Sequence, residues 1–204
     1  MKFIKWKILI VTSIVCLLPI LLGLSLWEKL PDTMAIHFDL NNNPDNFASK
    51  GFVVFGMPCL MVVLQWICCL INDINEKKHG SIIKFERVAK GIVPFTTVLL
   101  YLTTLGIGLG WDIDVRAVAA FIVGAIFILM GICLPKLDYI KNYDLSPDKA
   151  RKINRFAGFE TVILGVLFLI SILLPPISTV ICLALLIPCT LLGIIYGIKV
   201  SKGN

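Results

Sequence analysis

The chain has 204 residues, 58% of them hydrophobic, and a mean hydropathy of +0.92. These values exclude an ordinary soluble domain, because the segments between the apolar runs are too short to bury a separate core. The formal net charge of +6 does not indicate nucleic-acid binding, because the basic residues are sorted between loops as membrane insertion sorts them.

Six apolar runs are each long enough, or nearly so, to cross a bilayer as a helix of about 20 residues. They are Ile8–Trp27, Val53–Ile71, Ile92–Gly110, Ala117–Leu134, Phe159–Leu174 and Ser178–Ile198. Continuous apolar runs exclude an outer-membrane barrel, whose strands alternate. In lipid the backbone must satisfy its own hydrogen bonds, which a helix does. We therefore predict an all-α integral membrane protein with six transmembrane helices in three hairpins.

Sixteen of the 19 basic residues fall before the first run, between runs two and three, between runs four and five, or after the last. They are Lys2, Lys5, Lys7, Lys77, Lys78, Lys84, Arg87, Lys90, Lys136, Lys141, Lys149, Arg151, Lys152, Arg155, Lys199 and Lys202. Only Lys29, Lys50 and Arg116 fall on the other side. The positive-inside rule predicts a multi-pass protein with both termini in the cytoplasm.

This topology divides the chain into three parts. Residues 1–73 hold the first two helices and a long outer loop at 28–52. Residues 74–91 form a basic cytoplasmic loop, and residues 92–204 hold four helices with a second basic loop at 135–157. All seven cysteines lie inside the apolar runs, so we expect them to pack as small apolar residues and not to form disulfides or a zinc site.

The outer loop 28–52 is longer than a turn requires and has internal order. Apolar and polar residues alternate over Met34–Phe38, which predicts one short strand. Asn41–Asn46 is dense in turn formers, and Ser49 is placed to cap the helix that follows. A lone strand is not stable in water. We expect it to pack on the helix ends, to pair with another strand, or to become ordered on binding.

The two basic loops each contain the start of a helix. Ser81–Lys90 has apolar residues along one side, which predicts a helix lying on the inner leaflet. Ser146-Pro147-Asp148 is a helix start that leads towards the fifth run. Anchoring at the membrane surface is the simpler role for both, and docking of a protein is the alternative. The residues expected to contact lipid or a partner are Lys84, Arg87, Arg151, Lys152 and Arg155.

Two sets of residues recur in a known family. The outer loop holds Leu30-Pro31-Asp32, Ile36-His37-Phe38, Asn43-Pro44-Asp45 and Ser49-Lys50. This pattern resembles the outer motif of the bacterial SdpI-type membrane proteins. Asn43 stands where the family commonly has glycine, and both residues tolerate the left-handed geometry of a turn. The cytoplasmic side keeps the family's Leu145, Arg155 and Gly158. It departs from the family by lacking a GxRTP stretch and by having Ala150 for Trp and Asn154 for His.

The resemblance implies an immunity factor against a secreted toxic peptide, which also holds a repressor at the cytoplasmic face. It implies that the outer loop binds the peptide, through Asp32, Ile36, His37, Phe38, Asp39, Pro44 and Asp45. His37 and Asp39 are two apart, so in a strand they share one face. One histidine among scattered acids makes a poor metal site, and we predict none. The plain alternative is a solvated loop in which His37 makes a local hydrogen bond.

Enzymatic motifs such as HExxH, GxSxG or a phosphate loop are absent, so we predict no catalysis and no cofactor. No charge falls in the middle of a run, which argues against an ion-coupled pump. Glu160 lies at the start of the fifth run, within reach of Arg151 or Arg155. Gly106–Gly110 and Gly193–Gly197 have the GxxxG spacing that permits close helix contact, including contact in a homo-oligomer.

We therefore predict a multi-pass binding protein of the bacterial plasma membrane, of the immunity type, which protects against or senses a secreted membrane-active peptide. Its expected partners are the lipid bilayer, the peptide outside and a soluble regulator inside, without direct contact to nucleic acid. Two alternatives stay open. One is a small transporter or channel subunit, and the other is a structural membrane subunit without a ligand.

Overall fold

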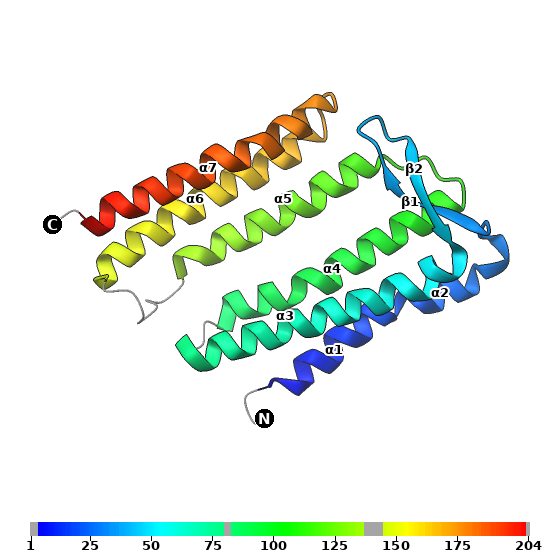
Figure 1. Cartoon of the computed structure of the whole chain (residues 1–204), viewed down its shortest axis with the longest axis horizontal. Helices are drawn as coiled ribbons and strands as arrows, with labels where there is room; N and C mark the ends of the chain where they lie inside the picture. Colours follow the sequence, from blue (N-terminus) through cyan, green and yellow to red (C-terminus); the bar gives the residue numbers. More distant parts are fainter. Residues whose placement is uncertain (1–3, 80–82, 137–144, 203–204) are drawn as a thin grey trace. The chain divides into compact units, whose positions relative to one another are not determined.

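A computed structural model describes residues 4–79, 83–136 and 145–202, which form helices and one antiparallel strand pair (Figure 1). Within these residues, six helices are long and apolar enough to cross a membrane, which confirms the predicted number. The candidate spans are Trp6–Ser25, Phe52–Lys77, Glu86–Gly108, Val115–Lys136, Pro147–Ser171 and Ile177–Lys202. The pairing of the spans into three hairpins and the cytoplasmic termini stay predictions.

The chain forms two compact units. The first unit consists of Met1–Ile74 and Lys90–Val118, and the second of Asn75–Ala89 and Ala119–Asn204. The elements are α1 (Trp6–Leu17), α2 (Pro19–Ser25), η1 (Trp27–Lys29), β1 (Thr33–Phe38), β2 (Pro44–Ser49), η2 (Phe52–Gly56), α3 (Met57–His79), α4 (Ile83–Gly108), α5 (Val115–Cys133), η3 (Leu134–Lys136), α6 (Pro147–Ser171) and α7 (Ile177–Lys202).

Prolines interrupt the helices of the first unit without ending the spans. Pro19 has no N–H to donate, so α1 stops at Leu17 and α2 begins at Pro19, while Leu18 keeps a helical backbone. Pro58 likewise leaves the carbonyl of Val54, four residues earlier, without its helical donor. The chain before Pro58 adopts the wider π-helical turn η2.

Each carbonyl that a proline frees in α3 or α4 accepts a hydrogen bond from the other helix. Tyr101 of α4 donates its hydroxyl to the Val54 carbonyl at 3.3 Å. Pro94 in α4 frees the carbonyl of Lys90, and Gln65 of α3 donates its Nε2 to that oxygen at 2.9 Å. Two reciprocal hydrogen bonds therefore fix the register of these helices.

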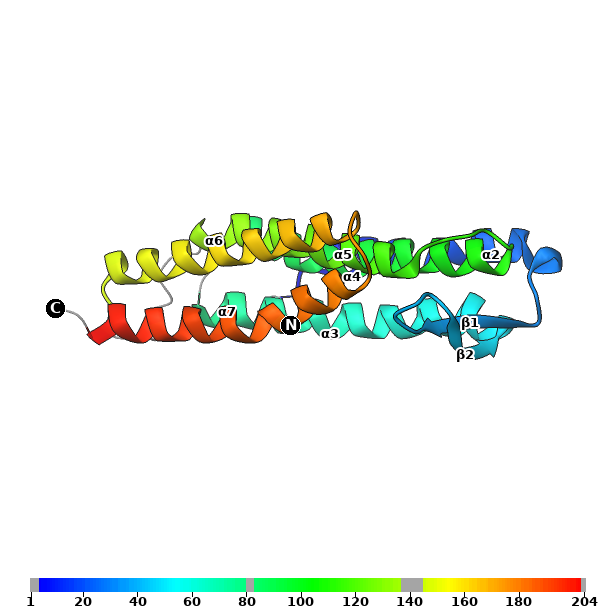
Figure 2. The same cartoon turned by 90° about the horizontal axis from the view of Figure 1, so that it is seen from above.

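The helices of the second unit approach one another at glycines. A Cβ atom added to Gly131 of α5 would lie 2.7 Å from the carbonyl oxygen of Gly158 in α6, and the reverse contact is equally short. Gly124 and Gly165 make a second such pair seven residues along. The side chains that these glycines lack therefore let the backbones of α5 and α6 meet. Helices α6 and α7 also lie side by side, as both views show (Figures 1 and 2).

One of the two predicted cytoplasmic helix starts is confirmed. Ser146 accepts a hydrogen bond from the Lys149 N–H at 3.4 Å, and α6 runs unbroken from Pro147 to Ser171. The other prediction is wrong. Ile83–Lys90 forms the first turns of α4 and not a separate surface helix, because the helix continues into the apolar run; Ser81 lies outside the described residues.

Both GxxxG segments make contacts inside the chain. Gly110 has φ +85°, and the Trp111 N–H bonds to the Gly106 carbonyl at 2.9 Å, so these glycines end α4. Gly193 faces Glu160 of α6, and Gly197 faces Ile153. Contact of these glycines with a second copy stays a prediction.

Candidate functional site

The loop between the first two spans folds as a hairpin of β1 and β2 (Figure 1). The prediction of a single strand followed by a turn is wrong in one respect. Pro44-Asp45-Asn46, which has turn composition, begins β2 and pairs with β1. Proline is tolerated at the first position of an edge strand, and β1 supplies the partner that local propensity lacks.

The hairpin packs against the helices of the first unit through β1. Met34 is 1% exposed and belongs to a cluster with Leu30, Tyr101 and Leu105. A Cβ atom on Gly108 would collide with the Met34 side chain, so the glycine at the end of α4 makes room for β1. The expectation that the strand packs on helix ends and pairs with another strand is confirmed.

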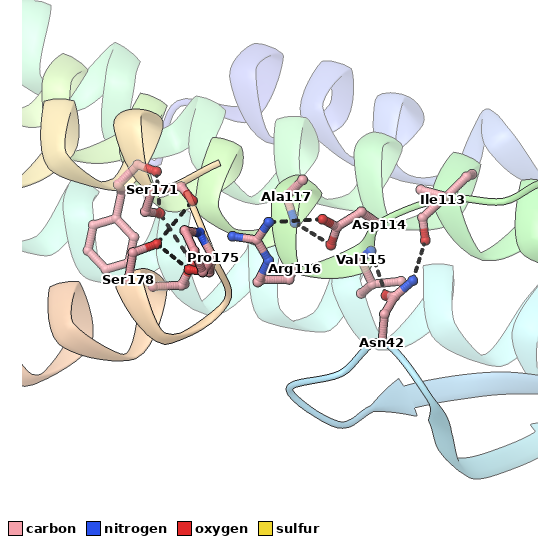
Figure 3. A network of polar contacts seen from close by, with 11 residues as sticks. Asn42, Ile113, Asp114, Val115, Arg116, Ala117, Ser171, Pro175 and Ser178 are labelled. Atoms are coloured by element: carbon pink, nitrogen blue, oxygen red, sulfur yellow. Dashed lines mark hydrogen bonds and ion pairs between the residues drawn. The ribbon is translucent and has the colours of Figure 1, made fainter. Parts of the chain in front are cut away.

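The tip of the hairpin is tied down by Asn42. Its Nδ2 donates to the Ile113 carbonyl at 3.0 Å, and its Oδ1 accepts from the Val115 N–H at 2.9 Å, as Figure 3 shows. Asn42 also has φ +65°, a left-handed conformation that asparagine tolerates better than most residues. One side chain thus joins the turn to the chain segment that begins α5.

The base of the hairpin is fixed by Lys50. Its N–H donates to the Asp32 carbonyl at 2.8 Å, and its Nζ lies 3.2 Å from the Asp32 carboxylate. The ammonium group also lies 4.9 Å from the centre of the Trp27 ring. Ser49 accepts from the Phe52 N–H at 3.2 Å, which confirms the predicted cap. The hairpin is therefore held at its face, tip and base.

The acids of the hairpin have separate partners. His37 Nδ1 lies 2.5 Å from Asp45 Oδ1 across the two strands. This is the local hydrogen bond that we expected if the segment were a solvated loop. The prediction that His37 and Asp39 share a strand face is wrong, because Asp39 lies beyond β1 in the turn. The backbone and side-chain amides of Asn43, with the Asn41 N–H, hold the pKa of Asp39 below its ordinary value.

The predicted ligand residues do not converge on one pocket. Ile36 and Phe38 are half-buried, and Ile36 packs against the core. Asp32 lies at the base and Asp39 at the tip, while Pro44 is exposed at the start of β2. Among the described residues, no group of three or more His, Cys, Asp or Glu side chains could hold a metal ion. The predicted residues are therefore spread over the base, the strands and the tip of the hairpin.

A buried ion pair lies elsewhere in the first unit. Asp73 of α3 pairs with Lys90 of α4, and both side chains are at most 2% exposed. Asp73 also accepts a hydrogen bond from the Lys5 backbone N–H at 3.0 Å. Both residues fall within candidate spans but near their ends, so the expectation that no charge lies in the middle of an apolar run is not contradicted. The spans extend beyond the apolar runs, and the two charges compensate each other.

Gln65 adds an unsatisfied acceptor to this buried region. It is fully buried, its Nε2 bonds to the Lys90 carbonyl, and its Oε1 has no hydrogen-bond partner in the described part of the chain. Sequence reasoning missed the cluster because it assigned Lys90 to a loop. The available signal was the short distance of Asp73 and Lys90 from the apolar runs of two consecutive helices, where facing charges can meet.

The residues expected to contact lipid or a regulator lie on α4 and α6. Arg87 is exposed near the start of α4, whereas the Lys84 side chain lies outside the described structure. Arg151, Lys152 and Arg155 are exposed on the first turns of α6. In the described part of the chain neither arginine of α6 forms an ion pair with Glu160.

The six apolar helices fit a multi-pass membrane protein. A family model described as "Domain of unknown function (DUF1648)", a domain found in membrane proteins, matches residues 14–62. The match runs from α1 through the hairpin into α3, so it covers the tethered hairpin of the first unit. Comparison with curated proteins and with solved structures finds no match.

Proposed function

We propose that this chain is a plasma-membrane protein of the bacterial SdpI type, which binds a secreted membrane-active peptide and protects against it or senses it. The tethered hairpin carries the proposal. Two spans can be joined by a few residues, yet here the connection forms a sheet held by Met34, Asn42 and Lys50. A surface ordered in advance binds a partner at a lower entropic cost.

The exposed chemistry of the hairpin suits a cationic and apolar peptide. Phe47 on β2 is 56% exposed and offers an aromatic surface. Asp45, on the same strand, and Asp39, in the turn, are exposed acids. Membrane-active peptides combine basic residues with apolar ones, which match these two features.

The basic residues near the starts of α4 and α6 support a contact on the inner side. With the predicted topology, Arg87, Arg151, Lys152 and Arg155 face the cytoplasm. Exposed arginines and lysines there attract anionic lipid headgroups, at roughly 1 kcal/mol per residue near the surface. The same side chains would bind an acidic patch on a soluble regulator.

The test is survival of a sensitive bacterial host that expresses the chain and is challenged with spent medium from peptide-producing strains. We expect the wild-type chain to protect the host. A variant with His37→Ala and Phe47→Ala should lose protection, because both side chains are exposed on the hairpin. Phe159→Ala is the matched control, since that ring is 66% exposed on α6 and is not part of the hairpin.

Unchanged survival, together with no binding of active fractions to the purified protein, would contradict the proposal. Protection that survives removal of Arg151 and Lys152 would favour simple immunity. Sensing would instead require a cytoplasmic protein that is recovered with the wild-type chain and lost from an Arg151→Ala, Lys152→Ala variant.

The buried Asp73–Lys90 pair favours a second candidate, a small transporter or channel subunit. Paired charges within membrane spans often mark ion pathways. This candidate predicts flux of an ion or small solute in proteoliposomes, with loss of flux in Asp73→Asn. A flat response across ions and small solutes would remove it.

A further inference from the structure

Glu160 is an acidic residue inside the fifth candidate span, and we propose that its carboxyl group is a proton-binding site within the membrane. The last basic residue before it is Arg155, five positions earlier on α6. At a rise of about 1.5 Å per residue, Glu160 lies about 7–8 Å further along the helix axis than Arg155. From Thr161 to Ser171 the span has no further charged residue.

The carboxyl group occupies a space that Gly193 leaves open. Gly193 is on α7, and a Cβ atom added there would lie 3.0 Å from Glu160 Oε2. Phe156 and Tyr196, each about one helical turn nearer the basic ends of α6 and α7, stack with ring centres 4.2 Å apart. The carboxyl group thus lies against the backbone of α7, with an aromatic pair towards the basic ends.

Among the residues that the structure describes, no basic group pairs with this carboxyl group. Glu160 has no ion pair or hydrogen bond to any other described residue. The other charged or titratable groups of α6 and of the elements packed against it are Asp148, Lys149, Arg151, Lys152 and Arg155 of α6, Arg116 and Cys133 of α5, Lys136 of η3, and Cys182, Cys189, Tyr196, Lys199 and Lys202 of α7. An unpaired carboxylate is costly in apolar surroundings, whereas the neutral acid is much less so.

A proton fits this position better than a metal ion does. Calcium and magnesium take six or more oxygen ligands, and one carboxyl group supplies two. Among the described residues no second acid or histidine joins Glu160 in a group that could hold a metal. One carboxylate oxygen instead takes a proton from water at the basic ends of the helices, forming a neutral carboxylic acid. The reverse step returns the proton.

The test is covalent labelling of the full chain in lipid vesicles with dicyclohexylcarbodiimide, an apolar reagent that reacts with protonated carboxyl groups. We expect labelling of Glu160 at neutral pH, located by mass spectrometry of fragments. Once the carboxylate predominates, labelling should fall about tenfold for each further pH unit. Glu160→Gln should abolish the label, and Glu28→Gln should leave it unchanged, because Glu28 is exposed outside the spans.

Two glycines of α7 provide a matched pair of variants that tests the geometry. Gly193→Ala should change the labelling rate several-fold, because the new methyl group displaces the carboxyl group. Gly197→Ala should leave the rate unchanged, because its Cβ atom would meet Ile153 at an ordinary 4.0 Å. Equal thermal unfolding of all variants in detergent shows that labelling reports the site and not misfolding.

Three results would overturn the proposal. They are absence of labelling at neutral pH, labelling that persists in Glu160→Gln, and labelling seen only with a water-soluble carbodiimide. The last result would mean that the carboxylate reaches interfacial water. These outcomes are independent of the peptide-challenge assay, so this proposal and the proposed function can fail separately.

Discussion

The two units of this chain hold their helices together by different means. The first unit joins α3 and α4 through buried polar side chains, with Tyr101 and Gln65 bonding to carbonyls that prolines have freed. The second unit joins α5 and α6 through glycines, whose missing side chains bring backbone against backbone. Directional bonds fix one register, whereas glycine contacts depend on shape alone.

The first unit holds the hairpin and the buried ion pair. The DUF1648 match at residues 14–62 lies entirely within it, as do the hairpin and the Asp73–Lys90 pair. Buried polar groups are costly in a membrane unless they are satisfied, so a helix pair that retains them has given up simpler apolar packing. The hairpin that we propose to bind the peptide belongs to this unit.

The largest expected effect comes from breaking the buried ion pair. Lys90→Met leaves the Asp73 carboxylate buried without its ammonium partner, and we expect a loss of about 3–5 kcal/mol in the free energy of unfolding. Unfolding in mixed detergent micelles measures it. Arg87→Met, an exposed change about one turn away on α4, should stay within about 0.5 kcal/mol.

A double variant separates the charge from the packing. Lys90→Met combined with Asp73→Leu removes both charges and should recover most of the loss, because a buried ion pair is often replaceable by apolar groups. If Lys90→Met costs no more than Arg87→Met, the first unit does not depend on this pair. The contrast with the second unit would then lose its strongest element.

The glycine contacts of the second unit predict the next effect. In Gly131→Ala the new Cβ atom would lie 2.7 Å from the Gly158 carbonyl, which is backbone and cannot rotate away. We expect α5 and α6 to separate at a cost of about 1–3 kcal/mol. Gly91→Ala is the control, because nothing lies within 4 Å of its Cβ position. A stability of Gly131→Ala equal to that of the control would contradict close backbone packing.

Hydropathy and charge predicted the spans of both units well, because length and composition alone decide whether a helix can cross a membrane. Local propensity failed at Pro44-Asp45-Asn46, where pairing with β1 overrides a turn-forming composition. The ion pair was missed because Asp73 and Lys90 lie beyond the apolar runs, on helical turns that continue the spans. Contacts between helices depend on rotation about each axis, which one sequence leaves undetermined.

The tip of the hairpin gives a smaller effect that tests preorganisation. Asn42→Ala removes two hydrogen bonds and places alanine at φ +65°, so we expect a cost of about 1–2 kcal/mol. Faster amide hydrogen exchange in β1 and β2 is the measurement. Asn42→Gly keeps the backbone conformation and isolates the hydrogen bonds. Exchange as slow as that of the exposed control Asn41→Ala would show that the tip is not tethered.

Removing one tyrosine hydroxyl group from each unit compares the stability of the two units directly. Tyr101→Phe leaves the Val54 carbonyl without its donor, and hydrogen bonds between membrane helices contribute about 0.6 kcal/mol on average. Tyr196→Phe in the second unit keeps the ring stack with Phe156 and should have no effect. Equal unfolding free energies for both variants would show that the proline-freed carbonyl needs no partner from α4.

The smallest effect concerns the pH dependence of the hairpin turn. The amides of Asn43, with that of Asn41, lower the pKa of Asp39 in the folded state, so the carboxylate stabilises the turn fully above its unfolded pKa. That contribution is lost as the pH falls through the folded pKa, and neutral or alkaline pH should leave the turn intact. The carboxyl carbon shift of Asp39, followed by NMR in an aspartate-labelled sample, gives the midpoint. A midpoint at or above that of unfolded aspartate would show that the amides do not hold the charged form, and the turn would then rely on Asn42 alone.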